Sequence, residues 1–211
     1  MKKIFTFGLL LWLATLPALS ASTAEQRDSR FKDGDIIFHS SSSDQSQAIH
    51  LATNSIYNHV GLIFYLNDKP MVLETLSTVR YTPLADWIRR GTSGHYVVKR
   101  LANAGTLLTT TKSKELHKQA RRHLNKPYDV YFEWSDNKLY CSELVWKAYF
   151  QTLGLKIGEL KPLRSYNITH PIVAHKLRER YGQKIPLNSL MISPGALFDS
   201  PLLTTIATEI K

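Results

Sequence analysis

The chain has 211 residues, carries a formal net charge of +10 and contains a single cysteine. This length is enough for one domain with its own hydrophobic core, and a lone cysteine excludes a framework of intrachain disulfides. The positive charge favours anionic partners such as lipid headgroups or cell-wall polymers, and simple solubility explains it equally well.

The N-terminus has the pattern of a bacterial export signal. Lys2 and Lys3 are followed by an apolar run over residues 4–16 and then by small residues. This arrangement predicts a signal peptide at residues 1–20, cut after Ser20. A retained membrane anchor is the alternative, but the run is shorter than the roughly 20 apolar residues that a membrane span needs.

Residues 21–211 are then expected to form a single domain, periplasmic or secreted, with no stable membrane anchor after cleavage. Export argues against nucleic acid as a partner, and the lysines and arginines are scattered rather than gathered in one stripe. An unpaired thiol in an oxidising compartment needs burial or a reactive role to explain it. The sole cysteine, Cys141, is therefore the first candidate for a functional residue.

The first half of this domain is rich in predicted strands. Residues 35–39 form a short predicted strand, and residues 44–52 form a short helix that Asp44 can cap. Two runs of strand formers, residues 59–66 and 71–76, flank turn residues and so predict a β-hairpin.

The rest of the chain is mainly helical. The predicted elements, in chain order, are one or two helical turns at 83–89, a strand at 96–100, a helix from 113 or 114 to 124, a helix from Cys141 to 154, a helix at about 171–181 and a short helix from 193 or 194. Strands come first and helices follow, an order that favours an α+β domain with an antiparallel sheet.

Cys141 lies at the start of a predicted helix. Leu144, Val145, Ala148 and Tyr149 recur at the three-and-four spacing of one apolar helix face. Unpaired N–H groups and the dipole at a helix N-terminus stabilise a thiolate, which is the nucleophilic form of cysteine. The alternative interpretation is a small buried hydrophobic residue, because free cysteines are commonly buried.

A cysteine nucleophile requires a histidine to hold its proton, and the chain has eight histidines. His59 is the candidate, because it opens a strongly apolar strand in which a polar side chain is otherwise out of place. A half-buried histidine at a sheet edge is the alternative. Others are expected on helix faces or in loops, most of them facing solvent: His39, His117, His123, His170 and His175. His50 is expected on the short helix and His95 at the start of a strand.

Glu74 is the candidate to orient this histidine. It lies on the returning strand of the predicted hairpin beside Val72 and Leu73, where an unpaired carboxylate would be costly to bury. A turn centred on Asn67 would place Glu74 opposite Val60, whereas a longer loop would leave it farther from the histidine. An ordinary carboxylate at a sheet edge is the alternative.

Three segments resemble the NlpC/P60 superfamily of papain-like cysteine hydrolases. Residues 125–129 read Asn-Lys-Pro-Tyr-Asp and residues 140–145 read Tyr-Cys-Ser-Glu-Leu-Val, a pair similar to the nucleophile region of that superfamily. Residues 59–64, His-Val-Gly-Leu-Ile-Phe, match the strand that carries its histidine. Glu74 falls where the third polar residue of the superfamily would stand. The resemblance therefore implies a Cys-His-Glu triad.

The order of the motifs resembles a circularly permuted branch of this superfamily. His59 precedes Cys141 by 82 residues, whereas most members place the cysteine first. The permuted branch includes YiiX/YaeF-like proteins and lecithin:retinol acyltransferase-like enzymes. Five ordered motifs carry the resemblance to the YiiX/YaeF-like group: residues 34–37, 58–61, 81–84, 126–129 and 140–143. It implies an α+β, circularly permuted papain-like fold, with an antiparallel sheet or small barrel packed on helices.

The chain departs from the superfamily pattern at three positions. Tyr140 replaces the aspartate before the cysteine, and Glu143 replaces the glycine after Cys-Ser. Both changes fit the permuted branch, but they weaken any transfer of substrate from ordinary wall peptidases. The third triad residue is Glu74 rather than the commoner histidine, and a glutamate can still accept the imidazole N–H and stabilise the imidazolium.

The resemblance implies an exported cysteine hydrolase that cleaves an amide bond, such as a peptide bond. Its substrate would be a peptide or acyl-amide of the cell envelope, with cell-wall-related peptides as one source. Cys141 would attack the carbonyl, His59 would protonate the leaving amine, and Glu74 would orient His59. Tyr128 either lines the substrate cleft or is a packed aromatic residue. No cofactor or metal is expected, since the histidines lack paired ligand spacing.

Three other functions remain open. A lipid-directed acyltransferase or thioesterase could use the same triad, and it would need a long apolar groove where a peptidase needs polar groups for the peptide backbone. A non-catalytic envelope binding module would keep the fold without depending on the thiol. A structural protein would bury the thiol of Cys141 away from His59.

Overall fold

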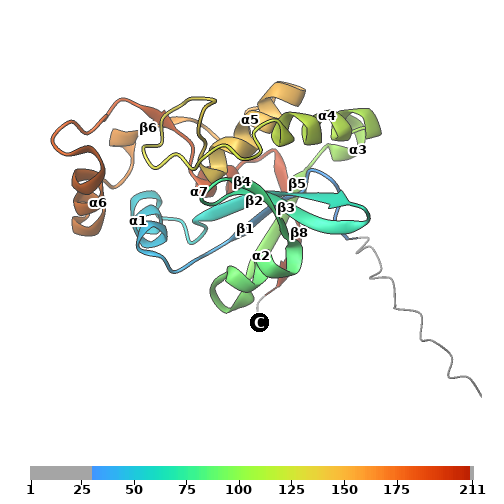
Figure 1. Ribbon diagram of the computed structural model, residues 1–211, viewed down its shortest axis with the longest axis horizontal. Coiled ribbons are helices and arrows are strands. Elements are labelled where there is room, and N and C mark those ends of the chain that lie inside the picture. Colours follow the sequence, from blue (N-terminus) through green and yellow to red (C-terminus); the bar gives the residue numbers. More distant parts are fainter. Residues whose placement is uncertain (1–29, 210–211) are drawn as a thin grey trace, which may run out of the picture.

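The computed structural model describes residues 30–209, so the predicted signal peptide at residues 1–20 lies outside the described residues. The centre of the fold is a six-stranded antiparallel sheet in the order β4-β3-β2-β1-β5-β8 (Figure 1). Its strands are β1 (Ile36–His39), β2 (His59–Leu66), β3 (Lys69–Thr75), β4 (Val79–Pro83), β5 (Tyr96–Leu101) and β8 (Leu203–Glu209). The short strands β6 (Lys161–Pro162) and β7 (Leu190–Met191) form a separate pair.

Helices cover both faces of the sheet. The helices of the described part are α1 (Asp44–Thr53), α2 (Leu84–Arg90), α3 (Ala104–Leu107), α4 (Thr110–Arg121), α5 (Cys141–Leu153), α6 (Pro171–Tyr181) and α7 (Pro194–Phe198), with 3₁₀ turns η1 (Thr92–Gly94) and η2 (Leu163–Ser165). α4 and α5 lie over one side of the sheet and α2 lies on the other, while α1 and α6 pack together at one end (Figure 1). Within residues 30–209, no helix combines the length and the apolar character needed to cross a membrane.

The alternation of side chains along the central strands explains the two layers of helices. In β1, Ile36 and Phe38 belong to the core cluster that includes Leu144 of α5. The residue between them, Ile37, belongs to the second cluster, which includes Trp87 of α2. Because successive side chains of a strand point to opposite faces, a fully apolar strand such as β1 has to be covered on both sides. The predicted α+β class, with an antiparallel sheet packed on helices, is confirmed.

Within the six-stranded sheet, two strands are absent from the sequence-based expectations, and both form its edges. β4 is short and ends at Pro83, and β8 is largely polar and only partly buried. An edge strand pairs on one side only, so it needs few of the apolar residues by which a strand is predicted. The expected start of α4 is also wrong by three or four residues, because the Thr109 side chain accepts the Lys112 N–H and caps the helix earlier.

The loop of the hairpin between β2 and β3 has two residues, whereas the expected strands, 59–66 and 71–76, left four residues between them. Leu66 pairs directly with Lys69, and the two residues between them, Asn67 and Asp68, have φ values of 50° and 60°. Two consecutive residues with positive φ are typical of a type I′ turn, whose twist matches that of the flanking strands. β3 therefore begins at Lys69, earlier than the expected start at residue 71, and the turn fixes the register that brings Glu74 beside His59.

Candidate active site

Cys141 is the first residue of α5, as the sequence predicts. It is buried, with 4% of its surface exposed, and the preceding Tyr140 has an extended backbone. The carboxylate of Glu143 accepts the Tyr140 N–H at 3.4 Å and so helps to define the beginning of the helix. The first N–H groups of a helix have no intrahelical acceptor, and together with the helix dipole they favour a negative charge on the sulfur.

The structure brings Cys141, His59 and Glu74 together. His59 is the first residue of β2, and its Nε2 lies 2.6 Å from Oε2 of Glu74 on β3. That bond leaves Nδ1 as the ring nitrogen available to the thiol. Burial by itself lowers the pKa of His59, but hydrogen bonds to Cys141 and Glu74 and the negative charge on both groups raise it to about 9. At neutral pH the arrangement therefore stabilises an imidazolium beside the sulfur.

The hairpin register differs from both arrangements considered in the sequence analysis. The turn is centred between Asn67 and Asp68, and Leu62 pairs with Leu73. Glu74 is consequently level with Gly61 rather than with Val60, and it reaches His59 diagonally across the two strands.

Glu74 is completely buried and is held by three partners. Besides His59, Oγ1 of Thr82 on β4 donates to Oε1 at 2.6 Å, and Nη2 of Arg90 at the end of α2 donates to the same oxygen. Burial raises the pKa of Glu74, but the bonds to His59, Arg90 and Thr82 outweigh this and lower it to about 2. Glu74 therefore stays ionised. Sequence reasoning did not identify Thr82 or Arg90, because only the folded sheet places them beside the carboxylate.

Two histidines expected to face solvent are buried. His39 is 2% exposed and stacks on Trp87 with ring centroids 3.9 Å apart, and His123 is fully buried. Burial, with the nearby charges of His59 and Arg90, lowers the pKa of His39 to about 2, so its ring is neutral. Burial also lowers the pKa of His123 to about 4, assisted by neighbouring cations. The expectation was wrong because it rested on local sequence, whereas α2 and the segment after α4 cover these two rings.

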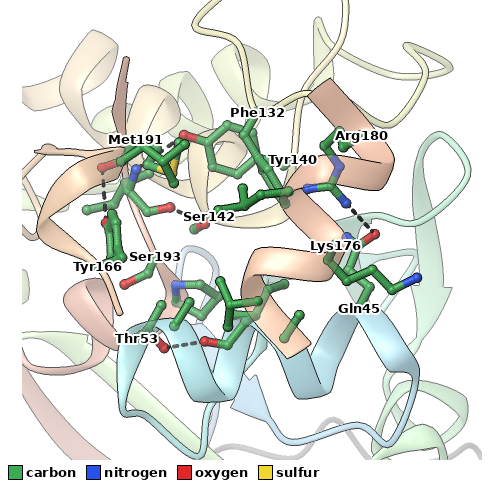
Figure 2. A pocket seen from close by; sticks show the side chains of 18 of the residues that line it. Gln45, Thr53, Phe132, Tyr140, Ser142, Tyr166, Lys176, Arg180, Met191 and Ser193 are labelled. Atoms are coloured by element: carbon green, nitrogen blue, oxygen red, sulfur yellow. Dashed lines mark hydrogen bonds between the residues drawn. The ribbon is translucent and has the colours of Figure 1, made fainter. Parts of the chain in front are cut away.

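Cys141 lies between two hollows of different character. On the His59 side is a polar cleft lined by His39, Ser41, Ser43, Gln45, Ser46, Ile49, Asn58, His59, Thr75, Leu76, Arg90, Tyr128 and Cys141. On the other side is a mainly apolar pocket between α1, α6 and the start of α5 (Figure 2). Ala48, Ala52, Leu163, Val173 and Leu177 contribute to its wall. A substrate bound at Cys141 would thus meet polar groups on one side and apolar groups on the other.

Tyr128 lines both hollows. Its hydroxyl accepts a hydrogen bond from Nε2 of Gln45 at 2.7 Å, which leaves the hydroxyl proton free to donate. Burial and the charge of Cys141 raise the pKa of Tyr128, so the phenol remains protonated. Tyr128 also contacts Phe132 edge to face, so it is both a cleft residue and a packed aromatic residue.

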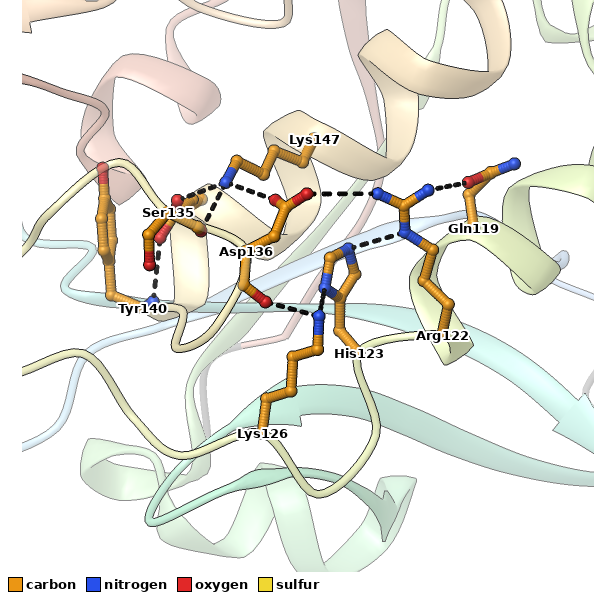
Figure 3. A network of polar contacts seen from close by, with 9 residues as sticks. Gln119, Arg122, His123, Lys126, Ser135, Asp136, Tyr140 and Lys147 are labelled. Atoms are coloured by element: carbon orange, nitrogen blue, oxygen red, sulfur yellow. Dashed lines mark hydrogen bonds and ion pairs between the residues drawn. The ribbon is translucent and has the colours of Figure 1, made fainter.

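A polar network ties the segment before Cys141 to α5 (Figure 3). Lys147 contacts the Ser135 carbonyl at 2.6 Å, Asp136 Oδ1 at 2.8 Å and Glu143 Oε1 at 2.8 Å. Burial raises the pKa of Glu143 to about 7, although Lys147 lowers it. Lys126 donates to the Asp136 carbonyl from the other side. The network anchors the segment immediately before the nucleophile.

No group of three or more histidine, cysteine, aspartate or glutamate side chains in residues 30–209 is arranged to hold a metal ion. The potential metal donors at the candidate site, His59, Glu74 and Cys141, instead bond to one another.

Comparison with known proteins agrees with the geometry. Residues 30–207 match the Peptidase_C92 family, described as a permuted papain-like amidase enzyme of the YaeF/YiiX type. The chain is 47% identical over 176 residues to the uncharacterized protein YiiX of Escherichia coli strain K12, covering 83% of this chain and 86% of that protein. A crystal structure described as metalloprotein YiiX from Escherichia coli O157:H7 superposes with a TM-score of 0.82 at 46% identity, covering 86% of this chain and 99% of that one. The motif pattern in the sequence likewise most resembles YiiX.

Proposed function

The chain belongs to the YaeF/YiiX family of permuted papain-like amidases, an amide-cleaving family of enzymes, and from this premise we propose that it is an exported cysteine hydrolase with Cys141, His59 and Glu74 as its triad. The observation that carries the proposal is the 2.6 Å hydrogen bond between Glu74 and His59, with His59 and Cys141 lining the same cleft. The Cys141 thiol there raises the pKa of His59. The shared cleft favours the enzyme over the alternative of a structural protein whose thiol is buried away from His59.

The proposed reaction begins with attack of the Cys141 thiolate on the amide carbonyl. The Cys141 N–H at the start of α5 and the free hydroxyl proton of Tyr128 are the donors for the oxyanion that forms. His59 gives its proton to the leaving amine, which breaks the C–N bond and leaves a thioester on the sulfur. His59 then takes a proton from water, the hydroxide adds to the thioester, and the acid is released with the thiolate restored.

The substrate is proposed to be a peptide or acyl-amide of the cell envelope. The export signal over residues 1–20 and the positive charge of the chain support this location, periplasmic or secreted. The polar cleft beside His59 suits the backbone of a peptide, with cell-wall-related peptides as one source.

A lipid-directed acyltransferase or thioesterase is the second candidate. The apolar pocket beside Cys141 favours it, because such an enzyme needs an apolar site for the acyl group. The two candidates share the Cys141 nucleophile and a thioester intermediate. They differ in the substrate that supplies the acyl group and in the molecule that then accepts it.

A metal-dependent step is not part of the proposal. The similar crystal structure is described as a metalloprotein, but residues 30–209 of this chain do not fit a metal centre. The described residues offer no cluster of three metal-binding side chains, and the donors nearest the nucleophile are engaged with one another.

The test is hydrolysis of matched amide, ester and thioester probes by the processed protein. We expect amide cleavage by the wild type and none by Cys141→Ala, with circular dichroism showing that the variant folds. If the protein cleaves the thioester or ester probes but not the amide probes, the amidase proposal is wrong and the acyltransferase or thioesterase is supported. Amide cleavage that survives in Cys141→Ala would exclude the triad, and a binding module is indicated if no probe is turned over.

A further inference from the structure

The apolar pocket beside Cys141 has a positively charged side. α6 forms one wall, and it brings the side chains of Lys176 and Arg180 to the pocket. Figure 2 shows both on the same side of the pocket, away from Tyr166 and Ser193. Among the described residues that line the pocket and the adjoining polar cleft there is no aspartate or glutamate. Apart from the thiolate of Cys141, the charged side chains that a bound molecule would meet there are all positive.

The two cations on α6 are not equivalent. Lys176 is paired with Glu179 on the same helix at 2.9 Å. Arg180 has no such partner: within residues 30–209, no carboxylate lies within ion-pairing distance of its guanidinium.

One other arginine in the described part of the chain is half-buried, and it does have a carboxylate partner. Arg100 makes a bidentate pair with Asp35. A guanidinium removed from bulk water is costly unless an anion compensates it. Arg180 is half-buried as well. It differs from Arg100 because no carboxylate in the described part of the chain compensates its charge.

Neutral groups hold Arg180 in position. Its Nη2 donates to Oε1 of Gln45 at 3.4 Å, close to the limit for a hydrogen bond, and its guanidinium lies over the ring of Phe132 at 4.7 Å. Gln45 in turn donates to the hydroxyl of Tyr128, which lines the pocket with Cys141. The guanidinium is therefore held in one orientation, and most of its five N–H donors remain available to a ligand. Through Gln45 it is linked by two hydrogen bonds to Tyr128, which lines the pocket beside Cys141.

We propose that Arg180 binds a carboxylate of the substrate while an apolar part of the same molecule fills the pocket between α1 and α6. The inference rests on the proposed amidase function and narrows its substrate class to amides that carry both an apolar group and a free carboxylate. A peptide with an apolar residue and a free C-terminus is one such molecule. The planar guanidinium matches the two oxygens of a carboxylate, which is why the group is assigned to Arg180 rather than to Lys176.

The test measures binding separately from catalysis. Cys141→Ala protein, which cannot turn over, is titrated by calorimetry with N-benzoyl-L-phenylalanine and with its neutral carboxamide. We expect the carboxylate probe to bind roughly tenfold more tightly than the carboxamide, since a partly shielded charge pair contributes on that scale. Adding Arg180→Gln should remove this preference without weakening the carboxamide, and Arg180→Lys should retain part of it.

Arg178→Gln is the matched control, because Arg178 is exposed on the same helix and does not line the pocket. It should leave the preference intact. Equal binding of the two probes, failure of the carboxylate probe to bind, or a preference that survives Arg180→Gln would each overturn the inference. If Arg180→Gln weakens the binding of both probes equally, Arg180 has a purely structural role and the inference is wrong. The titration needs no turnover, so the two claims can fail separately. If the carboxylate probe still binds more tightly but the wild type has no amidase activity, only the proposed function is refuted.

Discussion

The imidazole of His59 has partners on two sides, and these partners decide both its orientation and its charge. Glu74 accepts from Nε2, Cys141 contacts the remaining side, and Trp87 and His39 lie against the ring. A ring enclosed in this way has little rotational freedom, so the geometry for proton transfer is formed before substrate arrives.

The raised pKa of His59 predicts a loss of stability in alkaline solution. The folded-state pKa is about 9 against an ordinary value of 6.5, so the imidazolium contribution is complete below pH 6.5 and is lost as the pH rises through about 9. Urea unfolding of the wild type should show this decline, and His59→Gln should lack most of it. An identical pH profile for both proteins would contradict the ion pair.

Glu74→Gln tests the orienting carboxylate. The change removes the charge but keeps the size of the side chain, so we expect kcat to fall about a hundredfold or more while the fold persists. Since the pKa of Glu74 is lowered to about 2, its ionisation stabilises the protein above pH 4.5 and this contribution is lost as the pH falls toward 2. The variant should lack that acid dependence. Glu159→Gln at an exposed position is the control, and equal activity of the two variants would exclude the assigned role.

At the scale of single elements, the β2–β3 hairpin positions His59 and Glu74, two of the three residues of the proposed triad. Gly61 allows the strands to approach closely, because a Cβ there would lie 2.4 Å from Cγ1 of Val72 and 3.1 Å from the Leu73 carbonyl oxygen. A side chain at this position would push β3, and with it Glu74, away from His59.

Gly61→Ala should therefore destabilise the protein by about 1–3 kcal/mol and lower activity further than the change in stability explains. Gly105→Ala is the control, since a Cβ at Gly105 has no atom within 4 Å. Urea unfolding and amide turnover measure the two effects. A Gly61→Ala protein with wild-type stability and turnover would show that the hairpin does not depend on this approach.

Helix α5 depends on the buried pair of Glu143 and Lys147. Removing only the cation, as in Lys147→Met, leaves a buried carboxylate without its partner and should cost about 3 kcal/mol of unfolding free energy. The double variant Glu143→Gln/Lys147→Met should recover much of this loss, because the uncompensated charge is gone. Urea denaturation of the wild type, of Lys147→Met, of Glu143→Gln and of the double variant gives the comparison. Additive losses would show that the pair is not coupled.

For the molecule as a whole, the sequence singled out a candidate site residue where its local pattern already indicated the environment that the residue has in the fold. Cys141 was identifiable because an apolar helical pattern begins directly after it, and His59 because it interrupts an apolar strand. Glu74 was identifiable as a carboxylate among apolar residues. The resemblance of the motifs added the permuted fold, and the family match confirms it.

The remaining parts of the site depend on contacts between distant segments. Thr82 comes from the edge strand β4 and Arg90 from the end of α2, and the local sequence around each carries no sign that it contacts Glu74. Gln45 reaches Tyr128 across 83 residues of chain. The buried environment of His39 depends on Trp87 stacking on it from α2. Such contacts follow from the assembled fold, so local propensity could not predict them.

The predicted signal peptide makes a prediction about the N-terminus of the exported protein. Secreted or periplasmic protein recovered from a bacterial host should begin at Ala21, because the signal pattern places cleavage after Ser20. N-terminal sequencing, or the intact mass, measures this directly. A recovered protein that keeps residues 1–20 would instead support a retained anchor.

The central claim is that Cys141 forms a covalent acyl intermediate in an amide-cleaving reaction. The most direct measurement is rapid acid quenching during turnover of an amide substrate, followed by intact mass and peptide mapping. The account predicts an adduct with the mass of the substrate's acyl group on the peptide that contains Cys141, and none on Cys141→Ala. Turnover without an adduct on that peptide, or an adduct on another residue, would contradict it.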